Sequence, residues 1–176
     1  TSDAPLWLGI VCGELAEAGV DLGRLRAGDR SVCEVLRSIA THYRDGTPNG
    51  IRVDPASGLV WSPTHFTWMD TNHPAGSPRE GYPIEIQALW IRLLRLLGDD
   101  WKSMANQAAA SLAQLYKIPN DWLADQLIAD SGTPASEALA DNSLRSNGLL
   151  AVALGEVAGS CAQRMVAAAR RYLVVP

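Results

Sequence analysis

Residues 65–90 combine an acid, aromatic rings and further charged groups in one short stretch. The aromatic run from Phe66 to Trp68 leads to Asp70, which opens a segment rich in Thr, Asn, Pro and Gly. Because these residues favour turns and interrupt helices, we expect Asp70 in a loop. A nearby ring such as Trp68 would exclude water from the carboxyl group and raise its pKa, as a general acid working near neutral pH requires. The stretch therefore indicates acid catalysis and has the character of a carbohydrate site.

Two further charged residues follow Asp70 within one loop length. Arg79 and Glu85 could hold substrate hydroxyl groups by charge-assisted hydrogen bonds. Glu85 also lies in the first turn of a predicted helix, where the helix dipole stabilises an acid, so a structural role is the local alternative. His65 and His73 flank the acid, but no Cys, Glu or third His in the stretch completes a set of metal ligands. We expect neither a metal nor a cofactor.

One sequence pattern extends across this stretch. Thr-Trp-Met-Asp at 67–70 is followed by Pro-Arg at 78–79, Gly81, Ile-Glu-Ile at 84–86 and Ala-Leu-Trp at 88–90. This pattern resembles that of the amylo-α-1,6-glucosidase domain of glycogen debranching enzymes. That resemblance implies a cytoplasmic glycoside hydrolase that cleaves α-1,6-glucosidic branch points in glycogen or another α-glucan.

Two flanking segments resemble the same family. Residues 1–7 are similar to its segment before the motif, and Asp141, Arg145 and Asn147, followed by Ala-Val-Ala-Leu at 151–154, are similar to its segment after the motif. The match therefore spans nearly the whole chain in the family's order. The substrate-binding residues that the resemblance implies are Asp3, Trp7, Trp68, Arg79, Glu85, Arg145 and Asn147.

Some positions leave alternatives open or depart from the family. Asp3 and Trp7 lie before and at the opening of the first predicted helix, so a helix cap and a core tryptophan explain them equally well. Gln87 stands where the family usually has Asn, and Ser146 and Gly148 stand where it usually has Pro and Gln. These departures concern the finer hydrogen bonding of the site.

An inverting glycosidase needs two carboxyl groups, roughly 6.5–9.5 Å apart, one as acid and one to activate water. The resemblance assigns the acid to Asp70 and implies a base beyond Pro176. Glu80, Glu85 and Asp141 are the carboxylates available, and none matches the family's base motif. We therefore expect the chain alone to bind sugar weakly and to hydrolyse little or nothing.

The spacing of apolar residues predicts six or seven helices and one β-hairpin. In the first helix, Leu8, Val11, Cys12 and Leu15 recur with helical spacing. Residues 122–128 are too few to classify. The main expected helices span about 5–19, 32–45, 83–98, 99–118, 146–154 and 156–172, and the expected hairpin pairs 51–53 with 59–61.

Composition favours one folded domain. The chain has 176 residues, of which 47% are hydrophobic and 19% charged, far from the composition of disordered proteins. A net charge of −4 with scattered Arg and Lys argues against a nucleic-acid partner, and no apolar run is long enough to cross a membrane.

The predicted fold class is all-α, with a small β-hairpin at one end. The resemblance implies that residues 1–176 are a single domain, an internal fragment holding about half of an (α/α)6 barrel. The inner faces of residues 86–97 and 101–115 would then need cover from the remaining half of the barrel, from self-association or from repacking.

Two alternatives to a debranching enzyme stay open. Trehalases, neutral invertases and processing glucosidases share this barrel and a comparable acid motif. A helical half-barrel that binds without catalysis belongs to another class. If the chain belongs to a debranching enzyme or to another glycosidase, its partner is a glucan or oligosaccharide substrate.

Overall fold

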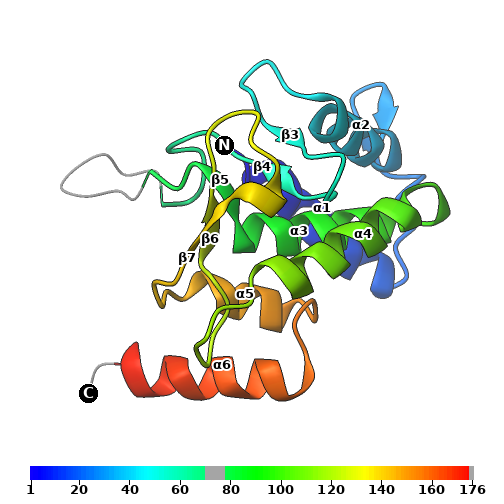
Figure 1. The fold of residues 1–176 in the computed structure, drawn as a ribbon. Helices are drawn as coiled ribbons and strands as arrows, with labels where there is room; N and C mark the ends of the chain where they lie inside the picture. Colours follow the sequence, from blue (N-terminus) through cyan, green and yellow to red (C-terminus); the bar gives the residue numbers. More distant parts are fainter. Residues whose placement is uncertain (70–77, 175–176) are drawn as a thin grey trace.

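The computed structural model describes residues 1–69 and 78–174, which form six α-helices, a short 3-10 helix and small antiparallel sheets (Figure 1). The helices are α1 (Ala4–Glu17), α2 (Val32–Asp45), α3 (Ile84–Leu97), α4 (Asp99–Leu115), α5 (Asn147–Ala153) and α6 (Gly159–Tyr172), with η1 at Ala135–Glu137. The strands are β1 (Arg26–Ala27), β2 (Arg30–Ser31), β3 (Arg52–Val53), β4 (Val60–Trp61), β5 (Gly81–Pro83), β6 (Gln126–Ile128) and β7 (Leu139–Asp141).

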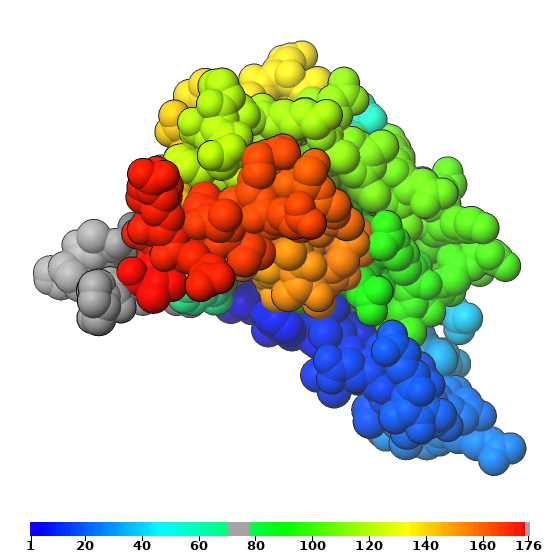
Figure 2. All heavy atoms as spheres, turned by 90° about the horizontal axis from the view of Figure 1, so that it is seen from below, coloured from blue at the N-terminus to red at the C-terminus, as the bar shows by residue number. Residues whose placement is uncertain are grey.

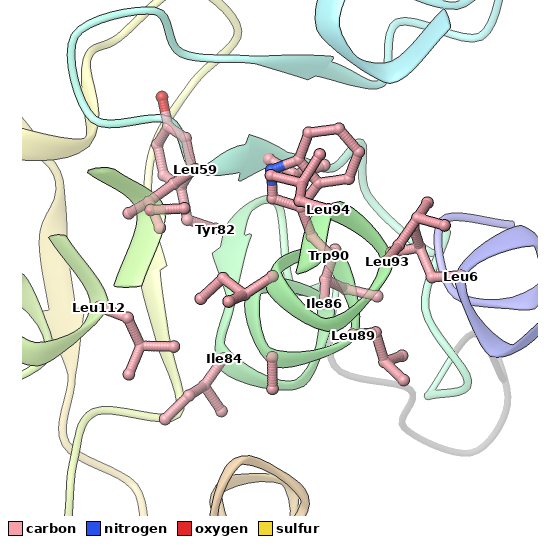
Figure 3. Packing of buried hydrophobic residues seen from close by; sticks show 14 of the residues in the cluster. Leu6, Leu59, Tyr82, Ile84, Ile86, Leu89, Trp90, Leu93, Leu94 and Leu112 are labelled. Atoms are coloured by element: carbon pink, nitrogen blue, oxygen red, sulfur yellow. The ribbon is translucent and has the colours of Figure 1, made fainter. Parts of the chain in front are cut away.

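Helix α3 is the centre of the fold, and α1, α2, α4 and α5 all pack against it. Nearly every residue from Ile84 to Leu94 is buried, on all sides of the helix. In Figure 3, Leu93 points toward Leu6 of α1, while Ile84 points toward α5. A helix that is apolar all round belongs in the interior. The chain itself therefore covers most of residues 86–94, which corresponds to the repacking that was one of the three expected kinds of cover.

Helix α1 confirms the prediction for residues 5–19, but it buries a different face from the one its large apolar residues mark. Leu8, Val11 and Leu15 are 40%, 53% and 38% exposed. The buried positions include Gly9, where an added Cβ would lie 3.0 Å from the Leu93 side chain. Because glycine lets two helices approach closely, Gly9 brings α1 against α3, and the buried face carries Leu6, Gly9 and Cys12. Of the periodic residues, only Cys12 belongs to that face.

The predicted hairpin is confirmed as β3 and β4, which pair antiparallel with Val53 opposite Val60. It is tied to α3 by Gln87, whose amide accepts from the Val60 N–H at 2.7 Å and donates to the Val60 carbonyl at 2.9 Å. The amide thus completes hydrogen bonds as a neighbouring strand would.

A second, three-stranded antiparallel sheet was not predicted. Its order is β5-β6-β7, with Tyr82 opposite Leu127 and Gln126 opposite Asp141. Strand β5 runs directly into α3, so this sheet lies at the start of the central helix (Figure 1). β1 and β2 form a third small sheet. The prediction of one hairpin in an otherwise helical chain is corrected accordingly.

Local signals set most helix ends. The capping box of α2 is formed by Ser31 and Glu34, as predicted. Helix α6 begins at Gly159, three residues later than expected, because the N–H groups of Glu156 and Val157 both bond to the Ala151 carbonyl at the end of α5. Residues 155–158 are therefore a C-terminal turn of α5.

Helices α5 and α6 form one face of the molecule, with α4 along one edge and α1 toward the opposite edge (Figure 2). Gly148 of α5 lets α6 approach, since an added Cβ would lie 2.8 Å from the Cε atom of Met165. No helix among residues 1–69 and 78–174 has both the length and the apolar character needed to cross a bilayer.

Candidate functional site

A hollow opens where the starts of α1, α3 and α5 meet the segment that ends at Met69. Its volume is about 270 Å³, near the lower end of the range for small-molecule pockets, roughly 300–1,000 Å³. The lining residues are Asp3, Trp7, Trp68, Glu85, Ser146, Asn147 and Leu150. The hollow thus combines aromatic walls with a few polar groups, the composition typical of a ligand site.

Two tryptophans form the aromatic walls. Trp7, in the first turn of α1, is 41% exposed, and Trp68 is 58% exposed. Asp3 occupies the N-cap position of α1, but its side chain makes no capping hydrogen bond. The structure therefore supports neither a capping role for Asp3 nor a core position for Trp7. Both residues face the hollow instead.

Glu85 and Arg79 form a buried ion pair at the floor of the hollow. Both guanidinium NH groups of Arg79 donate to the two oxygens of Glu85, and the side chains are 0% and 2% exposed. Burial raises the pKa of Glu85 above its ordinary range, and Arg79 only partly offsets that effect. Burial alone would lower the pKa of Arg79, but Glu85 and Asp125 hold it above its ordinary value. The guanidinium therefore stays charged.

Asp125, which the sequence analysis did not single out, connects the groups behind the hollow. Its Oδ2 accepts from Arg79 Nε at 3.1 Å and from Arg145 at 2.9 Å, and its Oδ1 accepts from Asn147 at 2.8 Å. Arg145 also donates to Asp141 at 2.8 Å. Burial alone would raise the pKa of Asp141, but hydrogen bonds from Arg145 and Ser143 hold it below its ordinary value. In this cluster, three carboxylates share two guanidinium groups.

Asn147, the first residue of α5, joins the buried cluster to the aromatic wall. Its Oδ1 accepts from the Trp68 indole N–H at 3.0 Å, and its Nδ2 lies 3.3 Å from the Met69 sulfur. The amide therefore contacts the motif segment with both of its ends. Asn147 is 4% exposed, so its end of the link is buried, whereas the Trp68 side chain is 58% exposed.

The backbone before α3 adopts conformations that residues with a side chain rarely adopt. His65 and Arg79 have φ angles of 58° and 52°, and the His65 N–H donates to the Pro78 carbonyl at 2.9 Å. At Gly81, φ is 121°, and an added Cβ would lie 2.2 Å from the Leu127 carbonyl oxygen. Such backbone strain clusters at functional sites, where surrounding contacts hold it.

The structure brings five of the seven predicted binding residues to the hollow: Asp3, Trp7, Trp68, Glu85 and Asn147. Arg79 and Arg145 lie behind it, in the buried cluster. The predicted acid Asp70 and the neighbouring His73 lie outside the described residues. Asp125 was missed, although an acid between the apolar pairs 123–124 and 127–128 is the signal that marks a buried, partnered carboxylate.

Comparison with known proteins identifies one family. A family model described as amylo-alpha-1,6-glucosidase matches residues 1–176. No curated protein and no solved structure matches the chain.

Proposed function

The chain belongs to the amylo-alpha-1,6-glucosidase family, and from this premise we propose that it carries part of a site that hydrolyses α-1,6-glucosidic branch points in an α-glucan. One observation supports the proposal above the others. Residues from three separate segments line one hollow. The segments are the start of α1, the stretch 65–90 with Trp68 and Glu85, and the start of α5. These are the segments whose sequence patterns resemble the family, and a shared binding site explains why they meet.

Asp70 is the proposed general acid of an inverting mechanism. It follows Met69 directly in the sequence, and the sulfur of Met69 contacts the Asn147 amide beside the hollow. Protonation of the glycosidic oxygen by Asp70 would release the branch while a second carboxylate activates water on the opposite face.

Glu85 and Asp125 are poor candidates for that second carboxylate. Both oxygens of Glu85 accept from Arg79, and both oxygens of Asp125 accept from Arg79, Arg145 or Asn147. A carboxylate held in this way cannot align a water molecule for attack without losing a buried partner. The expectation that the base is none of Glu80, Glu85 and Asp141 stays a prediction.

Sugar contact is assigned to the groups that line the hollow. Trp7 and Trp68 supply aromatic surface, and Asp3 supplies a carboxylate for hydroxyl groups. Arg79 has no exposed side-chain surface, so the contacts favour a role for it in holding Glu85. Its direct contact with sugar stays a prediction.

The finer fold assignment is also proposed. We infer that residues 1–176 contribute about half of an (α/α)6 barrel, as family membership suggests. The exposed apolar side chains of Leu8, Val11 and Leu15 on α1 support this, because helices of a barrel pack on both sides. Sedimentation should show concentration-dependent association through this face. A monomer at all concentrations, with Val11→Lys having no effect on its behaviour, would contradict that arrangement.

Titration calorimetry with isomaltose, an α-1,6-linked disaccharide, tests the binding proposal. Isomaltose should bind more tightly than maltose, and Trp7→Ala should weaken it about tenfold through lost apolar contact. Trp122→Ala is the matched control, because Trp122 packs against Tyr172 and does not line the hollow. Equal losses in both variants would argue against a sugar site here.

The choice of sugar separates the remaining alternatives. Release of glucose from limit dextrin by the full-length protein, without release from trehalose or sucrose, supports debranching. Preference for trehalose or sucrose would move the assignment to another glycosidase of the same barrel class. Binding without hydrolysis in every form of the protein would support a non-catalytic module.

A further inference from the structure

Asp125 lies behind the hollow, and the fold fixes its backbone on two sides. Its N–H donates to the Asp141 carbonyl at 2.9 Å, and its own carbonyl accepts from the Ile84 N–H at 3.0 Å. The side chain is 1% exposed and does not line the hollow. Any influence of Asp125 on a ligand must therefore pass through its neighbours.

The two oxygens of Asp125 have different partners. Oδ2 accepts from the guanidinium groups of Arg79 and Arg145, at 3.1 Å and 2.9 Å. Oδ1 accepts from the amide of Asn147, at 2.8 Å. One buried carboxylate thus holds two cations with one oxygen and orients an amide with the other.

The chemistry of a carboxylate decides which way the Asn147 amide points. An ionised carboxylate only accepts hydrogen bonds, so the NH2 end of Asn147 must face Asp125. The carbonyl end is then left for the indole N–H of Trp68, which donates to it at 3.0 Å. A reversed amide would place a donor against the indole donor and break the contact. The orientation of Trp68, an aromatic wall of the hollow, is therefore coupled to Asp125.

We propose that Asp125 is a positioning residue for the hollow: it sets the amide of Asn147, through which it fixes the Trp68 ring, and it holds Arg79 against Glu85. The coupling to Trp68 follows from the protein's own contacts. Its consequence for sugar affinity rests on the proposed function.

The Asp125→Asn variant tests the coupling without a ligand. Its amide oxygen would turn toward Arg79 and Arg145, so its NH2 group would face Asn147 and force that amide to reverse. The indole N–H of Trp68 would then lose its acceptor. In ¹⁵N NMR spectra, the Trp68 indole signal, assigned by its absence in Trp68→Phe, should shift and exchange with solvent at least about fivefold faster.

Asp141→Asn is the matched control. Asp141 also accepts from Arg145, at 2.8 Å, but the Asn147 amide donates to Asp125 instead. The Trp68 signal should therefore stay unchanged in this variant. An unchanged signal in folded Asp125→Asn, or an equal shift in both variants, would overturn the proposal.

A reciprocal exchange keeps the test decisive if Asp125→Asn folds poorly. Combining Asp125→Asn with Asn147→Asp reverses the pair, so that an amide NH2 donates to a carboxylate that can still accept from Trp68. The double variant should restore the Trp68 signal. Failure to restore it in a folded double variant would also overturn the coupling.

Isomaltose affinity then measures the consequence for binding. Asp125→Asn and Trp68→Phe should each weaken isomaltose by about fivefold, and the two together should weaken it no more than the larger single effect, because both act on one ring position. Multiplicative losses would contradict the coupling. If the wild-type chain does not bind isomaltose while the Trp68 signal responds as expected, the proposed function fails and the positioning role stands.

Discussion

The indole N–H of Trp68 donates a 3.0 Å hydrogen bond to Oδ1 of Asn147, across 79 residues of sequence. Trp68 belongs to the Thr-Trp-Met-Asp motif, and Asn147 begins α5. Neither segment carries a local signal that requires the other. The contact makes the aromatic wall of the hollow depend on how α5 packs. It also joins two separate segments whose sequence patterns resemble the family.

In the full-length enzyme, replacement of Asp70 by Asn should abolish most of the hydrolytic activity. An amide cannot donate an acidic proton to the glycosidic oxygen, so kcat on limit dextrin should fall at least about a hundredfold, the usual contribution of a general acid. Isomaltose affinity should change little, because binding and protonation are separate steps. Turnover within a few-fold of the wild-type rate would remove Asp70 from the mechanism.

Replacement of Arg79 by Met should destabilise the fold strongly. The substitution keeps much of the side-chain volume but leaves Glu85 and Asp125 buried without their shared cation, which typically costs about 3–5 kcal/mol. Urea unfolding followed by circular dichroism measures the free energy of unfolding. Arg24→Met is the control, because the Arg24–Asp21 pair is highly exposed and should contribute less than about 1 kcal/mol.

The helices and the hairpin could be predicted because their signals are local. Apolar spacing, the capping box at Ser31 and the stop at Gly98 lie within a few residues of the elements that they define. The buried face of α1 could not be predicted in this way. Part of its contact with α3 is made at Gly9, and a pattern of apolar side chains does not mark a residue that has none.

The sequence pointed to five residues that line the hollow, but not to the contacts among them. The sequence pattern identified Arg79 and Glu85, yet only the fold shows that they bind each other and are shielded from solvent. Asp125 was missed because β6 and β7 have three residues each, too few for a periodic pattern. What makes Asp125 important is a set of long-range contacts, which sequence spacing does not contain.

Gly81 should tolerate no side chain. At this position φ is 121° and an added Cβ would lie 2.2 Å from the Leu127 carbonyl oxygen, so Gly81→Ala should cost about 2–5 kcal/mol through backbone strain and steric overlap. Gly98→Ala separates the two causes, because Gly98 has φ of 84° and open space around it. That variant should cost about 1–2 kcal/mol. Equal melting temperatures for the two variants would show that β6 moves aside.

Asp141 should stabilise the fold above about pH 4 and lose this effect as the pH falls. Its folded pKa lies below the ordinary value of 3.8, so the unfolded chain takes up the proton first and acid favours unfolding. Glu85 has the opposite sign, because its raised pKa means that the folded state takes up its proton first. In Asp141→Asn, the decrease in unfolding free energy as the pH falls below about 4 should be smaller than in wild type. An identical pH profile would show that Asp141 gains nothing from Arg145.

Asp3 and Ser31 occupy equivalent positions at the starts of α1 and α2 but should respond differently to Ala. The Ser31 side chain accepts from the Glu34 N–H, whereas the Asp3 side chain makes no capping bond. Ser31→Ala should therefore lower the unfolding free energy by about 0.5–2 kcal/mol and leave isomaltose affinity unchanged. Asp3→Ala should leave stability nearly unchanged and weaken isomaltose by about fivefold, because Asp3 lines the hollow. Thermal unfolding and calorimetric titration of both variants give the four values. A stability loss at Asp3 that matches the loss at Ser31, with normal sugar binding, would show that Asp3 is a helix cap after all.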